Sequence, residues 1–123
     1  MIDHTGYVVS DFDRSVAFYT KALAPLNIKL VMTFQGKHAG FGVDGKPEFW
    51  IGVGPAPTDK IHIAFRASGR DQVRAFYEAA LAAGGTDNGP PGTRAHYHEN
   101  YYGAFVLDPD GHNVEAVCHD PYL

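Results

Sequence analysis

The sequence predicts an α+β fold built from two copies of one small unit. The order strand–helix–three strands occurs twice along the chain, and residues of the first copy recur 58 positions later. The chain has 123 residues, enough for one hydrophobic core, with 45% hydrophobic and 20% charged residues, as in globular proteins. We therefore expect one domain over residues 1–123, with a first module over about 1–54 and a second over about 60–119.

The first copy begins with a strand and an amphipathic helix. Residues 2–9 are rich in β-branched and aromatic side chains, which favours a strand. Asp11 or Asp13 can cap the helix that follows, and Pro25 ends it. The apolar face of this helix carries four residues at helical spacing: Phe12, Val16, Tyr19 and Leu23.

Three short strands complete the first copy, at residues 27–34, 37–43 and 48–53, with Gly, Asp and Pro between them. Residues 54–57, Gly-Pro-Ala-Pro, form a stiff connector to the second copy. This connector is the best candidate for an internal boundary.

The second copy repeats the pattern with a strand at residues 61–67 and a helix that Gly84 and Gly85 end. The apolar face of this helix carries Val73, Phe76, Tyr77, Ala80 and Leu81. After a stretch rich in Gly and Pro, residues 101–107 and 113–118 form two strands joined by the turn Asp-Pro-Asp-Gly.

The repeat is also visible residue by residue. With a shift of 58, eight of twenty positions are identical without a gap: His4/His62, Ser10/Ser68, Asp13/Asp71, Ala17/Ala75, Phe18/Phe76, Tyr19/Tyr77, Ala22/Ala80 and Leu23/Leu81. Two amphipathic helices can share a Phe-Tyr pair by chance, but this does not account for a histidine in the strand before each helix. We interpret the pattern as an internal duplication.

Composition excludes several partners. The net charge is −4, the pI is about 5.9, and no dense basic run is present, so we expect neither nucleic acid nor an anionic membrane as partner. No apolar stretch is long enough to span a membrane, and the first residues lack the pattern of a signal peptide. The single cysteine, Cys118, excludes an internal disulfide and suits the cytoplasm.

Strand alternation places chemically active side chains on one concave face. His62 alternates with Ile63 and Phe65 and so faces away from the helix, while Glu115 lies on one side of the last strand. With the symmetry of the repeat, His4, His62, Glu115 and Glu48 can converge and hold a divalent transition metal with open positions. The alternative is that each is an ordinary solvated or hydrogen-bonded strand residue.

Three segments resemble the vicinal oxygen chelate superfamily: IDHTGYVVSDFDRSVAFYTKAL, KIHIAFRA and AFVLDPDGHNVEAV. The superfamily includes lactoylglutathione lyases, extradiol dioxygenases, fosfomycin-inactivating thiol transferases and bleomycin-binding proteins. The resemblance implies paired βαβββ modules that form an open, cup-like mixed β-barrel with flanking helices. It also implies His4, His62 and Glu115 as ligands of Zn, Ni, Mn, Co or Fe, with Glu48 in the fourth position, and a homodimer in which modules pair within or between chains.

The chain departs from the lactoylglutathione lyases at two positions. Val8 stands where those enzymes carry an arginine for the glutathione carboxylate, and Gly52 stands where they carry an asparagine. A glutathione adduct is therefore not the expected substrate. The fosfomycin enzymes have a basic cluster, for which this chain offers mainly Arg66 and Arg94.

Residues 94–102 (RAHYHENYY) lengthen the second copy with a polar, aromatic and histidine-rich segment. It is either a pocket wall in which His96 or His98 relays protons, or an exposed loop. His112 and His119 are expected at the surface, and Cys118 is expected to be structural.

The expected function is that of a glyoxalase-like, metal-dependent lyase or isomerase that acts on a small molecule with neighbouring oxygens. Glu48, Glu115 or the histidines at 96 and 98 would move the proton. Two histidines and one carboxylate also describe an Fe(II) dioxygenase. A non-catalytic binding or resistance protein is the third possibility.

Overall fold

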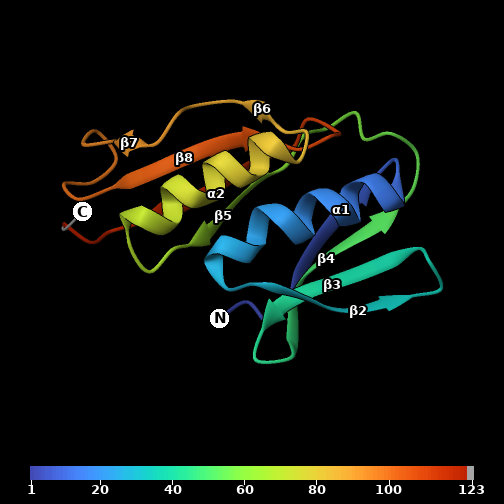
Figure 1. Cartoon of the computed structure of the whole chain (residues 1–123). Coiled ribbons are helices and arrows are strands. Elements are labelled where there is room, and N and C mark those ends of the chain that lie inside the picture. Colours follow the sequence, from blue (N-terminus) through green and yellow to red (C-terminus); the bar gives the residue numbers. More distant parts are fainter. Residues whose placement is uncertain (122–123) are drawn as a thin grey trace.

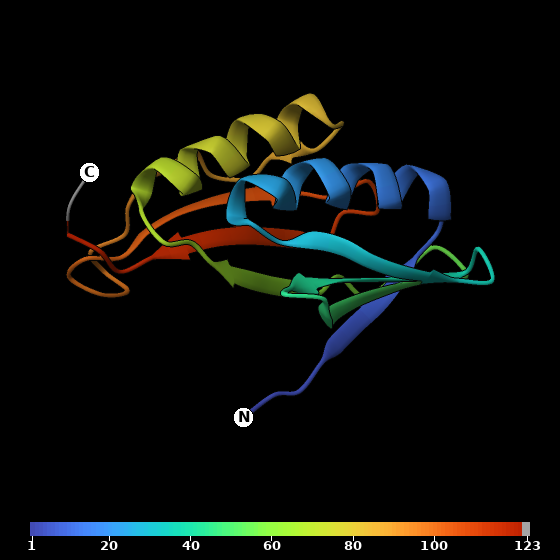
Figure 2. The same cartoon turned by 60° about the horizontal axis from the view of Figure 1, so that its bottom comes forward.

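The computed structural model describes residues 1–121, so the last two residues of the expected domain lie outside the described part. Two mixed sheets lie on one side of the molecule and two helices cover them from the other (Figures 1 and 2). The first sheet has the order β1 (Thr5–Val9), β4 (Lys46–Val53), β3 (His38–Val43) and β2 (Lys29–Phe34). The second has the order β5 (His62–Arg66), β9 (Asn113–Cys118), β8 (Tyr102–Leu107) and β6 (Thr86–Asp87), with β7 (Gly92–Thr93) also paired to β8.

The helices begin and end where their local chemistry dictates. Asp11 caps α1 (Phe12–Leu23) by accepting a hydrogen bond from the backbone of Arg14. A short 3₁₀ turn, η1 (Ala24–Leu26), follows because Pro25 cannot continue the helix. The second helix, α2 (Arg70–Ala82), ends before Gly84, whose φ of 102° is accessible mainly to glycine.

The two sheets have the same topology, as the duplication predicts. In each sheet a parallel pair, β1–β4 or β5–β9, is extended by antiparallel strands. A shift of 58 also brings the first residue of α1 onto the first residue of α2. The second sheet differs at its edge, where β6 and β7 replace one long strand; the sequence did not predict these two-residue strands in a stretch rich in Gly and Pro.

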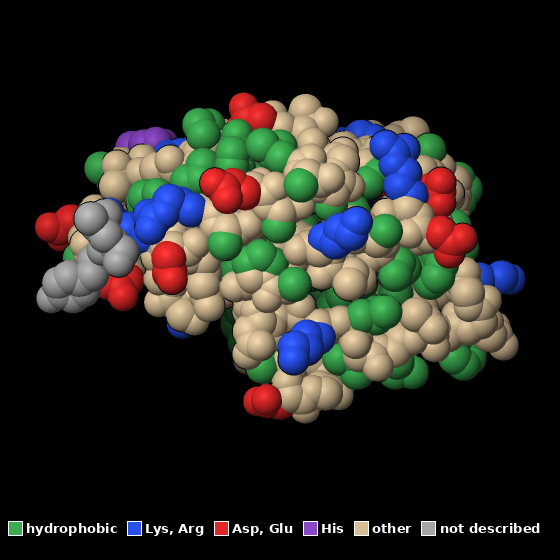
Figure 3. Space-filling view, viewed as in Figure 1, with side chains coloured by type: hydrophobic (Ala, Val, Ile, Leu, Met, Phe, Trp, Pro, Cys, Tyr) green, Lys and Arg blue, Asp and Glu red, His purple; other side chains and the backbone are tan. Residues whose placement is uncertain are grey.

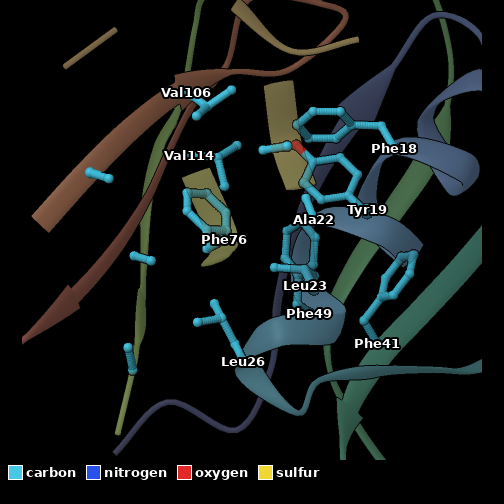
Figure 4. Packing of buried hydrophobic residues seen from close by; sticks show 14 of the residues in the cluster. Phe18, Tyr19, Ala22, Leu23, Leu26, Phe41, Phe49, Phe76, Val106 and Val114 are labelled. Atoms are coloured by element: carbon cyan, nitrogen blue, oxygen red, sulfur yellow. The ribbon is translucent and has the colours of Figure 1, made fainter. Parts of the chain in front are cut away.

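The hydrophobic core lies between the helices and the sheets (Figure 4). Phe18 and Phe76, which are equivalent in the repeat, are both fully buried there. Alternation along β9 buries Val114 and Ala116 together with Cys118, which is 2% exposed and packs in the core as predicted. Since this side of each sheet packs on the helices, the other side, the helix-free face, is left for function.

A buried polar network joins the two halves. The hydroxyl of Tyr19 donates to Asp108 at 2.6 Å, and that of Tyr7 lies 2.5 Å from that of Tyr19. His112 was expected at the surface, but it is only 1% exposed. Its Nδ1 accepts a hydrogen bond from the backbone N–H of Ile61, and its Nε2 donates one to the carbonyl of Val8. Both nitrogens of the buried ring therefore have a hydrogen-bond partner.

His119 is exposed, as expected. On the face seen in Figure 3, acidic and basic side chains are interspersed. Within residues 1–121, no helix has the length and apolar character needed to cross a membrane.

Candidate functional site

The second half contains a tight histidine–carboxylate pair on its helix-free face. His62 begins β5 and Glu115 lies in the middle of β9, the strand paired with β5. The His62 Nε2 and Glu115 Oε1 atoms are 2.8 Å apart. Glu115 is 1% exposed, whereas about half of the His62 side chain is accessible. A carboxylate so well buried needs hydrogen bonds or a cation to remain charged.

Tyr101 closes the site over the second oxygen of Glu115. Its hydroxyl donates to Glu115 Oε2, and its ring packs against Tyr97 and His119. Burial, followed by the hydrogen bond to Glu115, raises the pKa of Tyr101 well above its usual value. The phenol therefore stays protonated near neutral pH and remains a donor. Sequence reasoning left the segment of Tyr101 as either a pocket wall or an exposed loop and did not assign Tyr101 this contact.

The two histidines proposed as proton relays do not contact this pair. His96 stacks on Tyr97 with ring centroids 4.1 Å apart, and His98 lies edge-on to His119. Both are exposed. Residues 95–99 of this segment are exposed, and the residue of the segment that contacts Glu115 is Tyr101.

In the first half, His4 lies just before β1 and is exposed. Its Nδ1 is 2.7 Å from the carboxylate of Asp3, and this hydrogen bond is the main reason that the pKa of Asp3 is lowered. Because Nδ1 donates to Asp3, Nε2 is left with its lone pair for a ligand role. His4 lines a pocket of about 490 Å³ together with His38 and Trp50.

Glycines lie against two of the rings that line this pocket. A Cβ at Gly40 would come within 2.9 Å of the Trp50 ring, and a Cβ at Gly52 would come within 2.9 Å of the His38 ring. The rings of Trp50 and His38 therefore lie close to the backbone of these glycines.

Glu48 lies at an irregularity of the first sheet, where the pairing of β3 with β4 shifts between Phe41 and Gly42. It is exposed and lines a different pocket, of about 310 Å³, with Asp3 and the apolar Phe49 and Phe65. This pocket lies at the seam between the halves, where the two phenylalanine rings meet at 5.2 Å. Glu48 and His4 directly precede Phe49 and Thr5, which are register partners in the sheet, but the two residues line different pockets.

The structure brings together His62 and Glu115, and it leaves His4 and Glu48 apart from them. Among the described residues, no three His, Cys, Asp or Glu side chains are close enough to hold one metal ion. The four residues proposed as ligands are therefore divided between the two halves of the chain.

The chemistry of the pair at His62 and Glu115 fits a divalent ion. Imidazole nitrogen and carboxylate oxygen are common donors for Zn, Ni, Mn, Co and Fe. An ion would also compensate the buried charge of Glu115. Of the four residues, His62 and Glu115 are the two that one chain places together for such an ion.

Comparison with known proteins establishes the family. The family model described as "Glyoxalase/Bleomycin resistance protein/Dioxygenase superfamily" matches residues 1–116. The chain belongs to this superfamily. The resemblance of the three sequence segments is thereby confirmed, and so is the expected α+β fold with an open rather than closed arrangement of sheets.

Solved structures with the same fold span several activities. A glyoxalase/bleomycin resistance protein from Albidiferax ferrireducens T118 is 26% identical, with a TM-score of 0.82 over 94% of this chain and 96% of that one. A glyoxalase-related enzyme from Fulvimarina pelagi is 20% identical, with a TM-score of 0.73 over 95% and 86%. The fosfomycin resistance protein FosX from Mesorhizobium loti is 19% identical, with a TM-score of 0.68 over 95% and 90%. No curated protein matches the sequence.

Proposed function

We propose that this superfamily member is a glyoxalase-like, metal-dependent lyase or isomerase that acts on a small compound with two neighbouring oxygens. The observation that supports this most is the buried Glu115 carboxylate, 2.8 Å from a half-exposed histidine on the helix-free face. A hydrogen-bonded pair of this kind at the surface of a sheet serves stability poorly, because burying a charge is costly. It serves well as half of a metal site.

The other half of the site is proposed to come from a second copy of the chain. His4 and Glu48 are both exposed, and in one chain neither lies near His62 and Glu115. Apolar side chains also remain on the helix-free face of the first sheet: Val8, Met32 and Phe34 are 42%, 44% and 54% exposed. A twofold dimer that covers this face can bring the first half of one chain against the second half of the other.

A divalent ion at this site would act as a Lewis acid toward the two oxygens of the substrate. The protein's own groups supply the rest. Glu115, or Glu48 where it is left outside the metal shell, accepts the proton that the substrate releases. Tyr101 holds Glu115 in place through its hydroxyl. Val8 and Gly52 stand where lactoylglutathione lyases carry an arginine and an asparagine. Glutathione would lack these two contacts here, so the proposed substrate is a smaller molecule.

One observation favours a second candidate, an Fe(II) dioxygenase. Glu48 lines a pocket different from that of His4. Without Glu48 the donor set is two histidines and one carboxylate, which is the set of non-haem Fe(II) oxygenases. Oxygen consumption with a panel of catechols separates this activity from a lyase or isomerase, which consumes no oxygen.

Mixing two inactive variants tests both the metal and the dimer. His4→Ala and His62→Ala should each abolish stoichiometric binding of Mn, Fe, Co, Ni or Zn, measured by elemental analysis after dialysis. When the two variants are denatured, mixed and refolded together, random pairing makes half of the dimers mixed, each with one intact site. About a quarter of the wild-type metal content should then return.

Lys21→Ala, which removes an exposed side chain from the last turn of α1, is the control and should keep full metal content. No recovery in the mixture would contradict a site shared between two chains. Failure of the wild-type protein to bind any of the five metals near one per chain would exclude the proposed function.

A further inference from the structure

A pocket distinct from the two described above adjoins the histidine–carboxylate pair on the helix-free face of the second sheet. It has a volume of about 310 Å³ and is lined by Asn88, Gly89, Arg94, Tyr97, Phe105 and Asn113. Two of these residues also border the pair. Asn113 is the register partner of His62, and Phe105 is the register partner of Glu115. The ring of Phe105 lies 6.2 Å from that of His62. A ligand in this pocket would therefore reach the proposed metal site.

Arg94 is held rigidly in this pocket. One terminal nitrogen donates to the carbonyl of Pro90 at 2.9 Å, the other donates to that of Thr93 at 3.3 Å, and the guanidinium lies 5.4 Å from the ring centroid of Phe105. A Cβ at Gly89 or Gly92 would approach its nitrogens to 3.3 and 3.1 Å, tighter than ordinary contact. Gly89 also has a φ of 143°, which side chains rarely adopt. The loop is thus shaped around the guanidinium.

This fixed cation has no anionic partner of its own. Within residues 1–121, the ion pairs are those of His4 with Asp3 and of His62 with Glu115, and neither includes Arg94. Two of the five guanidinium N–H groups point to carbonyls, and the remainder are available. A guanidinium so placed matches a carboxylate, whose two oxygens can accept in parallel.

Asn113 adds a second polar feature to the pocket, a hydrogen-bond acceptor without a donor. Its Oδ1 is one of two buried side-chain oxygens in the described part of the chain that accept no hydrogen bond, the other being that of Ser15 in α1. A buried acceptor without a donor is unfavourable, and a ligand hydroxyl would supply the donor. Tyr97 and Phe105 offer aromatic surface to the carbon skeleton of a ligand.

We propose that this pocket binds a small 2-hydroxycarboxylate, with its carboxylate on Arg94 and its hydroxyl on Asn113. Its identification as the substrate of the neighbouring site rests on the proposed function. The hydroxyl and carboxylate are neighbouring oxygen groups, and the register of Asn113 with His62 places them beside the pair. The pocket belongs to one half of one chain, so binding does not depend on a metal or on dimerisation.

The test is calorimetric titration of the metal-stripped protein with 3-phenyllactate. We expect saturable binding, at least about tenfold weaker in Arg94→Gln, since a charge-assisted bidentate contact is lost. Arg14→Gln removes an exposed arginine of α1 and should change the affinity less than about twofold. Asn113→Ala should weaken binding several-fold, and the methyl ester of 3-phenyllactate should not bind, because it lacks the charge.

The test does not depend on any single variant. If Arg94→Gln perturbs its loop, the ester and Asn113→Ala still decide. No binding by the wild type, equal affinity for acid and ester, or full competition by inorganic phosphate at the same concentration would overturn the assignment. If the wild-type protein binds no metal but binds the acid through Arg94, the proposed function is refuted and this inference stands. If the wild-type protein binds metal normally but binds the acid equally well without Arg94, this inference is refuted and the proposed function stands.

Discussion

The two halves of the chain repeat one topology, but their helix-free faces differ. In the second half, Glu115 is buried and receives hydrogen bonds from His62 and Tyr101. In the first half, His4 and Glu48 are exposed and line separate pockets. The strand orders correspond apart from the edge, but the residues at equivalent positions differ: Ala64, two residues after His62, pairs with Glu115, whereas Gly6, two residues after His4, pairs with Trp50.

A second difference is the loop at one edge of each sheet. Between β2 and β3 the chain turns over residues 35–37, whereas between β7 and β8 it makes a longer excursion over residues 94–101. The longer loop brings Tyr101 onto Glu115 and Arg94 onto Phe105. The duplicated scaffold thus repeats the position of the histidine but not that of the glutamate, and the longer loop encloses the pair of the second half.

The largest expected effect comes from breaking the connection between the halves. His112→Ala removes a buried ring whose two nitrogens bond to Ile61 and Val8, and leaves a cavity with two unsatisfied backbone groups. We expect a loss of about 3 kcal/mol in the free energy of unfolding. Urea denaturation at neutral pH measures it. The exposed His119→Ala should lose less than about 0.5 kcal/mol; equal effects of the two variants would mean that His112 does not hold the halves together.

A smaller effect is expected from removing the hydroxyl of Tyr101, which is bonded to Glu115 in the second half. Tyr101→Phe removes the hydroxyl that donates to Glu115 and leaves a buried carboxylate oxygen without that donor. The expected loss of stability is about 1–2 kcal/mol. Tyr97→Phe, at an exposed tyrosine of the same loop, is the matched control and should change stability by less than about 0.3 kcal/mol. If both variants are as stable as the wild type, Tyr101 does not secure Glu115.

The smallest expected effect concerns the buried tyrosines around the first half. Burial is the main cause that raises the pKa of Tyr7 and of Tyr19 above the ordinary value of 10.0. The unfolded chain therefore releases these protons first, and the stability that they contribute is complete below about pH 10 and is lost above it. Each should contribute a loss of about 1 kcal/mol between pH 10 and pH 11.

Tyr7→Phe removes one of these two titrating groups. The decline in its unfolding free energy over that range, measured by urea denaturation at each pH, should be shallower than in the wild type by about the same 1 kcal/mol. An unchanged slope would show that Tyr7 is not held protonated in the folded state.

The sequence determined the repeated topology and most element boundaries. Apolar spacing, the Asp11 cap and the glycines after α2 act locally, so they can be recognised without knowing the fold. Alternation along β5 and β9 likewise placed His62 and Glu115 on one face before their contact was known. The first strand was predicted too long and the edge strands β6 and β7 were missed, because strand ends depend on a partner rather than on composition.

Only the tertiary structure decided which polar residues are buried and which meet. His112 follows a turn, a position typical of the surface, and is buried because two distant segments close around it. Whether Tyr101 or a neighbouring histidine reaches Glu115 depends on the path of a loop, which no local periodicity encodes. The separation of His4 from His62 has the same origin: symmetry made the two residues equivalent, but the packing of α1 on α2 and of Phe49 on Phe65 sets how the halves meet. Contacts between segments far apart in sequence are properties of packing, and packing is what the sequence pattern alone does not express.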